Sequence, residues 1–229
     1  MGQRLAILDD YQAVAFDYAP WAELAEDGVE VTVFGEPLAD VADSLRDFDI
    51  IMAMRERTTF DAGLFRQLPK LKLLVTTGMA NAAIDLLAAA EQGITVCGTG
   101  GSPAAAPELT WALLLAFARR VPFEDRRLRA GNWQSTVGFE LSGKTLGVLG
   151  LGKIGSKIAG YGKAFGMEVI AWSPNLTEET AAAAGARKVG KEALFRESDV
   201  VSVHVRLSER SGGSSGRTNC GSSGPTVSW

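Results

Sequence analysis

A regular alternation of short apolar runs with longer amphipathic stretches constrains the fold of this chain more than any other feature. The apolar runs are rich in Val, Ile and Leu, which is typical of strands that are buried on both faces of a sheet. The segments between them carry apolar residues at helical spacing, for example in 38–48, 82–92 and 154–165. Strands that alternate with helices form βαβ units, so we predict an α/β protein with parallel sheets. The predicted strands cover residues 5–8, 29–34, 50–54, 71–76, 94–97, 145–149, 168–172 and 200–205.

The alternation is interrupted once, which indicates a boundary between two domains. A turn-rich stretch, GTGGSP, follows the fifth predicted strand, and residues 104–120 then form one long predicted helix. We therefore place one domain at residues 1–101 and a second, doubly wound domain at residues 102–209. The remaining segment, 210–229, is dominated by Ser and Gly and has no hydrophobic period, so we expect a disordered tail that is foreign to the fold before it.

The composition argues against several classes of protein. With 23 Lys and Arg against 27 Asp and Glu, the formal net charge is −4, which is unlike a dedicated nucleic-acid binder. No apolar run reaches the roughly 18 residues that a membrane helix needs. The two cysteines and the single histidine, His204, are too few for a disulfide framework or a His-rich metal site. We expect a cytoplasmic protein with no metal, no nucleic-acid partner and no membrane partner.

One glycine motif carries most of the functional information. Gly150, Gly152 and Gly155 form a G-x-G-x-x-G pattern that follows an apolar strand and opens an amphipathic helix, as dinucleotide binding requires. The first glycine permits a tight turn, the second lets a diphosphate approach the backbone, and the third lets the helix pack closely on the sheet. Free N–H groups and the helix dipole then meet the phosphate charge. The alternative is a glycine-rich turn that binds nothing.

The residues after the next strand leave the choice of cofactor open. NAD enzymes usually carry Asp or Glu there to hold the ribose hydroxyls, whereas this chain has Ser173, Pro174 and Asn175. No carboxylate repels a 2′-phosphate, and no adjacent Arg attracts one. Ser173 or Asn175 could donate a hydrogen bond to a ribose oxygen, and a simple turn residue is the alternative for Ser173. The sequence is compatible with NAD or NADP and leans slightly toward NADP.

Six stretches, in order along the chain, resemble the D-isomer-specific 2-hydroxyacid dehydrogenase family, which includes phosphoglycerate dehydrogenases and glyoxylate/hydroxypyruvate reductases. They include MRERT at 54–58, which is similar to the family's R-x-R-T loop, and TGMAN with a following Ile-Asp at 77–85. SDVVSVH at 198–204 resembles the family's A-D-x-V-S-L-H strand. The others are residues 7–11, residues 107–110 and the glycine motif. The resemblance implies a flavodoxin-like substrate domain, a partial Rossmann domain that binds NAD or NADP, and hydride transfer between a D-2-hydroxy acid and a 2-oxo acid.

The resemblance also assigns residues to sites. Arg55 and Arg57 would line the substrate site, with a solvated surface pair as the alternative. The backbone N–H groups of Gly78 and Met79 would bind the substrate carboxylate, since N–H groups in a turn after a strand suit an anion. The cofactor would contact a set of residues in the second domain, of which the lone histidine has a purely structural alternative. These residues are Thr110, Gly150, Gly152, Lys153, Ile154, Gly155, Ser173 and His204.

The catalytic groups of the family do not match this chain. Family members use an Arg that binds the carboxylate, a His that transfers the proton and a Glu that orients it, all beyond the strand matched by 200–205. We therefore name no catalytic residue and expect a truncated enzyme of low activity that dimerises through the helix over 104–120. A dinucleotide-sensing, corepressor-like protein and an inert fragment are the alternatives. The identity of the 2-oxo acid stays open.

Overall fold

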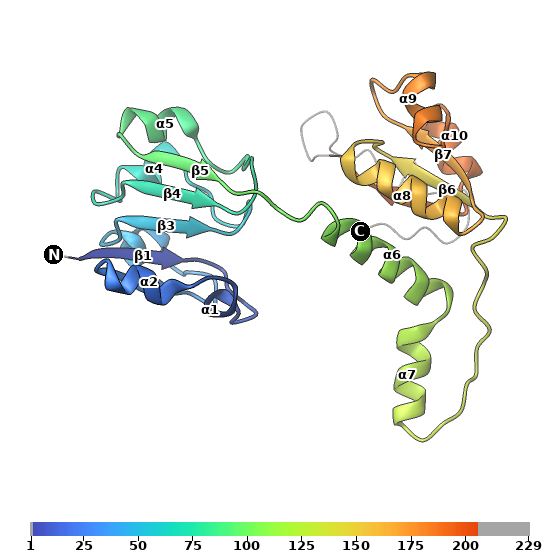
Figure 1. Cartoon of the computed structure of the whole chain (residues 1–229), viewed down its shortest axis with the longest axis horizontal. Coiled ribbons are helices and arrows are strands. Elements are labelled where there is room, and N and C mark those ends of the chain that lie inside the picture. Colours follow the sequence, from blue (N-terminus) through green and yellow to red (C-terminus); the bar gives the residue numbers. More distant parts are fainter. Residues whose placement is uncertain (1, 206–229) are drawn as a thin grey trace. The chain divides into compact units, whose positions relative to one another are not determined.

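The computed structural model describes residues 2–205 of the chain (Figure 1). These residues divide into two compact units, 2–101 and 102–205, and each has its own sheet. The tail predicted over 210–229 lies outside the described residues.

The first unit is a parallel α/β sandwich built on five strands in the order β2-β1-β3-β4-β5. This order is that of the flavodoxin-like fold, so the prediction for this unit is confirmed. Three of its helices begin at an aspartate, because Asp40, Asp61 and Asp85 each accept a hydrogen bond from the N–H three residues ahead. The strands are β1 (Gln3–Ile7), β2 (Val29–Val33), β3 (Ile50–Ala53), β4 (Leu73–Thr76) and β5 (Thr95–Gly98). The helices are α1 (Ala15–Tyr18), α2 (Trp21–Glu26), α3 (Val41–Leu45), α4 (Ala62–Phe65) and α5 (Leu86–Glu91).

The second unit has four parallel strands in the order β8-β7-β6-β9. Counted from the first strand of the unit, this is 3-2-1-4, which is the start of the Rossmann order 3-2-1-4-5-6, so the predicted partial Rossmann domain is confirmed. The strands are β6 (Thr145–Leu149), β7 (Glu168–Trp172), β8 (Arg187–Lys188) and β9 (Val200–Val203). The helices are α6 (Ala105–Ala118), α7 (Val121–Arg129), α8 (Lys153–Ala164), α9 (Glu178–Ala183) and α10 (Lys191–Glu197).

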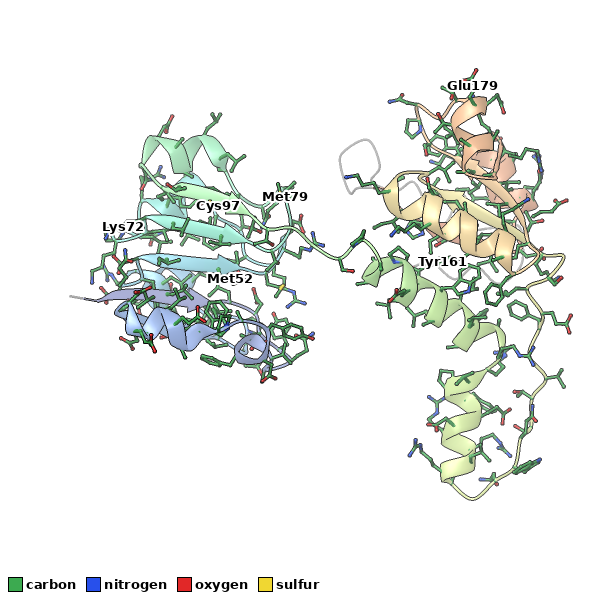
Figure 2. All side chains as sticks on the ribbon, in the orientation of Figure 1. Met52, Lys72, Met79, Cys97, Tyr161 and Glu179 are labelled. Carbon is green, nitrogen blue, oxygen red and sulfur yellow. The ribbon has the colours of Figure 1, made fainter. Side chains whose placement is uncertain are left out.

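The core of the second unit joins α6 to α8 through aromatic side chains. The Trp111 ring lies 5.7 Å from that of Tyr161 and 5.0 Å from that of Phe165, measured between centroids. Figure 2 shows Tyr161 on the side of α8 that faces α6. This seam fixes α8, and with it the glycine motif at its N-terminus, against the rest of the unit.

Two elements of this unit differ from the sequence prediction. The long helix ends at Ala118 instead of residue 120, because Arg120 has a φ of +58° and turns the chain into the separate helix α7. Strand β8 consists of two exposed polar residues, so it gives no apolar signal. In the described part of the chain, no helix combines the length and the apolar character needed to cross a membrane. Residues 2–205 also contain no group of three or more His, Cys, Asp or Glu side chains that could hold a metal ion.

Candidate nucleotide and substrate sites

The turn between β6 and α8 depends on glycine at two positions. Gly150 has a φ of +99°, and its N–H donates to the carbonyl oxygen of Trp172 at 2.8 Å. A Cβ at Gly150 would lie 2.7 Å from the carbonyl oxygen of His204. A Cβ at Gly155 would clash with the carbonyl oxygen of Gly150. These two glycines therefore let the chain turn tightly and let α8 approach the sheet, as the motif predicts.

Gly152 has a different environment, and it is the position that fits a phosphate. It is the N-cap of α8 and makes no side-chain cap, and, apart from its two chain neighbours, no atom of residues 2–205 would lie within 4 Å of a Cβ built there. The N–H groups of the first helical turn, including those of Lys153 and Ile154, have no acceptor within the helix. Both residues are exposed. A negatively charged group can therefore reach these donors, and the helix dipole favours it there.

Ser173 stands directly beside this turn. Its hydroxyl oxygen accepts a hydrogen bond from the N–H of Leu151 at 2.8 Å and so fastens the glycine turn to the end of β7. Among residues 2–205 the Ser173 hydroxyl donates no hydrogen bond, so its proton can be offered to a ligand. The sequence prediction identified Ser173 as a ribose contact but missed this bond to the backbone.

His204 is held by the protein itself. Its ring Nε2 lies 2.7 Å from the hydroxyl of Ser202, and its backbone N–H donates to the carbonyl oxygen of Leu149 at 2.7 Å. Burial lowers the pKa of the His204 imidazole below its ordinary value, which favours the neutral ring. The imidazole contact is thus intramolecular, while the carbonyl of this residue helps to shape the turn at Gly150.

Thr110 lies on α6, away from the glycine turn in sequence. Its hydroxyl donates to the carbonyl oxygen of Ala106 at 2.8 Å, one turn earlier in the helix. Thr110 and Ser202 line the same small cavity, which lies between α6, α8 and β9. The structure thus brings Thr110 close to β9, which His204 directly follows.

In the first unit, Arg55 and Gly78 contact each other at the carboxyl end of the sheet. Arg55 has a φ of +53°, and its guanidinium covers Gly78 so closely that a Cβ there would collide with it. The N–H of Gly78, predicted to bind a carboxylate, donates to the hydroxyl of Thr99 at 2.9 Å. The neighbouring Met79 is 78% exposed. Figure 2 shows Met79 and Lys72 at opposite ends of this sheet, so Met79 marks the end at which the strands finish.

Arg57 is exposed, and its guanidinium contacts the loop after β1. Its Nη1 donates to the carbonyl oxygen of Asp9 at 3.1 Å, and its guanidinium carbon lies 4.5 Å from the centroid of the Tyr11 ring. The Tyr11 hydroxyl in turn donates to Oδ1 of Asp9 at 2.9 Å, and this bond raises the pKa of Tyr11. Nothing in the sequence pattern points to Asp9 or Tyr11 as partners of Arg57, because their relation depends on β1 and β3 being neighbours in the sheet.

These observations define the class of the protein: an α/β nucleotide-binding protein of the Rossmann type with a second, flavodoxin-like unit. Residues 111–225 match the family pattern of the D-isomer specific 2-hydroxyacid dehydrogenase, NAD binding domain. The chain belongs to the D-isomer specific 2-hydroxyacid dehydrogenase family, which confirms the resemblance seen in the sequence. The cofactor class, a pyridine nucleotide, is confirmed by the same match.

Individual relatives agree with this assignment. The phosphoglycerate oxidoreductase of Vibrio cholerae o395 is 37% identical, with a TM-score of 0.84 over 92% of this chain and 69% of that chain. The D-lactate dehydrogenase of Aquifex aeolicus, solved with NAD and lactic acid, is 26% identical, with a TM-score of 0.70 over 90% of this chain and 62% of that chain. The glyoxylate reductase of Aeropyrum pernix is 40% identical over 159 residues, which are 65% of this chain and 48% of that protein. The chain thus spans about half the length of this curated relative.

Proposed function

We propose that this protein binds NAD or NADP and serves hydride transfer between a D-2-hydroxy acid and the corresponding 2-oxo acid. The observation that carries the proposal is the N-terminus of α8 at Gly152, where none of the residues that the structure describes, chain neighbours aside, comes within 4 Å of a built Cβ. A diphosphate bound there would accept hydrogen bonds from the N–H groups of the first turn. The nicotinamide ring of such a cofactor supplies the hydride acceptor or donor.

On the nucleotide side, the residues of this chain bind and orient. Gly150 and Gly155 keep the turn tight, and Lys153 and Ile154 offer their backbone N–H groups to the diphosphate. Ser173 fixes the turn through Leu151 and offers its hydroxyl proton to the ribose. Thr110 and His204 complete the proposed cofactor contacts, with His204 acting through its position at the turn rather than by transferring a proton.

On the substrate side, we assign Arg55, Arg57, Gly78 and Met79 to a 2-oxo acid. The lactic acid bound to the Aquifex aeolicus relative is a 2-hydroxy acid, the reduced counterpart of such a substrate, which fits this assignment. The guanidinium groups provide the positive charge that a carboxylate needs. Because Thr99 occupies the N–H of Gly78, the substrate carboxylate would have to displace this hydroxyl or use the N–H of Met79 instead.

We propose that turnover by these 229 residues is low. A 2-oxo acid needs a proton donor as the hydride arrives, and the sequence contains a single histidine, His204, which is bonded to Ser202. Loss of a general acid alone typically costs on the order of 10²–10⁴-fold in rate. We also propose that the protein acts in the cytoplasm. We propose further that it forms a homodimer joined through α6, and sedimentation measures whether a dimer is present.

Calorimetric titration with NADH, NADPH and ADP tests the binding step, and a reductase assay with glyoxylate and hydroxypyruvate tests turnover. We expect saturable binding of at least one dinucleotide together with weak or undetectable reduction. Absence of binding for every nucleotide would overturn the proposed function. Turnover equal to that of a complete family member would contradict the proposal of low activity while leaving the binding site in place.

A further inference from the structure

Lys191 places a positive charge beside the end of β7, although residues 173–177, which directly follow this strand, include no Lys or Arg. It is the first residue of α10, and the short segment before it follows β8. Its Nζ lies 5.7 Å from the centroid of the Trp172 ring, within the range of a cation–π contact. Trp172 is the last residue of β7 and directly precedes Ser173. The ammonium group is therefore beside the end of β7, although eighteen positions separate it from Ser173 in the sequence.

The backbone holds this segment against β7. The N–H of Val189 donates to the carbonyl oxygen of Ala171 at 3.0 Å, and β7 pairs with β8 through Ala171 and Lys188. Behind Lys191, the side chains of Leu194 and Phe195 pack on the face of the sheet to which Trp172 belongs. The start of α10 is consequently a rigid part of the Rossmann unit.

The location of Lys191 matters because of where a dinucleotide runs on this fold. The diphosphate lies at the glycine turn after β6, and the adenine ribose lies at the end of β7. All strands of this sheet are parallel, so the carboxyl ends of β6, β7 and β8 lie at the same side of the sheet. A cation at the start of α10 therefore lies beside the carboxyl end of β7, where the 2′-position of the adenine ribose is expected.

The surrounding charges favour an anion at this position. Residues 173–177 contain no Asp or Glu. Within residues 2–205, Lys191 forms no ion pair, although Glu192 directly follows it in the first turn of α10. Along the chain from Ser173, the nearest acidic residues are Glu168, at the opposite end of β7, and Glu178 at the start of α9. Glu179 follows Glu178, and Figure 2 shows it on the outer side of this helix.

We infer that Lys191 binds the 2′-phosphate of NADP(H) and makes this protein prefer NADP(H) over NAD(H). The inference deepens the proposed function and depends on it, because it assigns the cofactor choice of the same site to one residue. The 2′-phosphate carries charge that the 2′-hydroxyl lacks, so the ammonium group would gain a charge-assisted hydrogen bond only with the phosphorylated cofactor.

The test compares ligands that differ only at the 2′-position. Calorimetry would give the dissociation constants of NADPH against NADH, and of adenosine 2′,5′-bisphosphate against 5′-AMP, for the full chain. We expect the unmodified protein to prefer the phosphorylated member of each pair by about tenfold or more, the size of one bond to a charged group. Lys191→Met should lose most of this preference by weakening the 2′-phosphorylated ligands, with the NADH constant unchanged. Lys191→Arg should retain the preference.

Lys163→Met is the matched control, because it removes the same charge from an exposed lysine in the last turn of α8, at the opposite end of that helix from the glycine turn. Its preference should equal that of the unmodified protein. An unmodified chain that binds NADH as tightly as NADPH, or a Lys191→Met chain that keeps the full preference, would overturn the inference while leaving the proposed function standing. Failure of all four ligands to bind the unmodified chain would overturn both.

Discussion

At the scale of single residues, the second and third glycines of the motif, Gly152 and Gly155, have separable roles. Gly152 has free space around a built Cβ, whereas a Cβ at Gly155 would collide with the backbone oxygen of Gly150. We expect Gly152→Ala to leave the free energy of unfolding nearly unchanged but to weaken dinucleotide binding by about tenfold or more, because the methyl group occupies the phosphate position.

Gly155→Ala should lower the free energy of unfolding and should affect dinucleotide binding less than Gly152→Ala does. Alanine would normally stabilise a helix interior by about 1 kcal/mol relative to glycine, but here overpacking against rigid backbone costs about 1–3 kcal/mol. Urea denaturation of both variants, with calorimetry of their nucleotide binding, separates the two roles. Equal loss of stability in both variants would show that the space at Gly152 is structural and not a ligand position.

The titration of His204 gives a second prediction at this scale. Burial holds the pKa of its imidazole below the ordinary value of 6.5, so the unfolded chain takes up the proton first as the pH falls. Stability is therefore unaffected by this group well above pH 6.5 and declines as the pH drops through 6.5 toward the folded pKa. His204→Gln keeps a polar group near Ser202 but does not titrate.

The measurement is the free energy of unfolding between pH 7.5 and pH 5.5 for both proteins. Carboxylates titrate equally in the two chains, so the difference between their pH profiles isolates His204. We expect the unmodified protein to lose more stability over this range than His204→Gln. Parallel profiles would mean that the imidazole is as easily protonated in the folded chain as in the unfolded one.

The sequence identified the residues with a backbone role better than it identified side-chain partners. Gly150 and Gly155 follow from local geometry, because a Cβ at either position would collide with neighbouring backbone, and Gly152 follows from the space that a bound phosphate needs. The restraint of Arg57 by Asp9 and Tyr11, and the approach of Lys191 to Trp172, depend on which strands are neighbours. No spacing along the chain contains that information.

At the scale of elements, the seam between α6 and α8 determines how firmly the nucleotide turn is held. Trp111 is 8% exposed and contacts two aromatic rings of α8 and the residue that follows it. Trp111→Ala should cost about 3–5 kcal/mol of unfolding free energy, as is typical for a buried large aromatic residue. Trp133→Ala removes a ring that is 80% exposed and should cost less than about 0.5 kcal/mol. Denaturant titration of the second unit measures both, and similar costs for the two variants would contradict this packing.

Elements with a strong periodic signal were predicted, and elements without one were missed. Strands β6 and β7 agree with their predicted ranges because each is a continuous apolar run with both ends marked. Helix α7 lacks a buried apolar face, although Pro122 in its first turn and the arginines in its last turn are ordinary signals of a helix start and end. Strand β8 has only backbone pairing to β7 and exposed polar side chains, so its pattern resembles that of a loop.

At the scale of the whole molecule, each unit has a hydrophobic core of its own. Buried clusters centred on residues such as Phe60 and Phe65 belong to the first unit, and clusters that include Trp111 and Ile158 belong to the second. The residues that we propose for substrate binding all lie in the first unit, and those that we propose for cofactor binding all lie in the second. Ligands of the two kinds should therefore stabilise different parts of the chain.

This separation gives a prediction about unfolding. A ligand that binds only the folded state stabilises it by about 2.7 kcal/mol when present at 100 times its dissociation constant. We expect dinucleotide at this concentration to raise the free energy of unfolding of the second unit by this amount, which raises its urea midpoint, and to leave the first unit unchanged.

The fluorescence of Trp172 and Trp111 reports on the second unit, and that of Trp21, next to the first sheet, reports on the first. Single-tryptophan variants, in which the other tryptophans are replaced by Phe, would record each unit separately in urea. Because Gly152→Ala occupies the phosphate position, it should reduce the shift at the same nucleotide concentration without altering either midpoint in the absence of nucleotide. A dinucleotide-induced shift of equal size at Trp21 would show that the two cores unfold as one cooperative body.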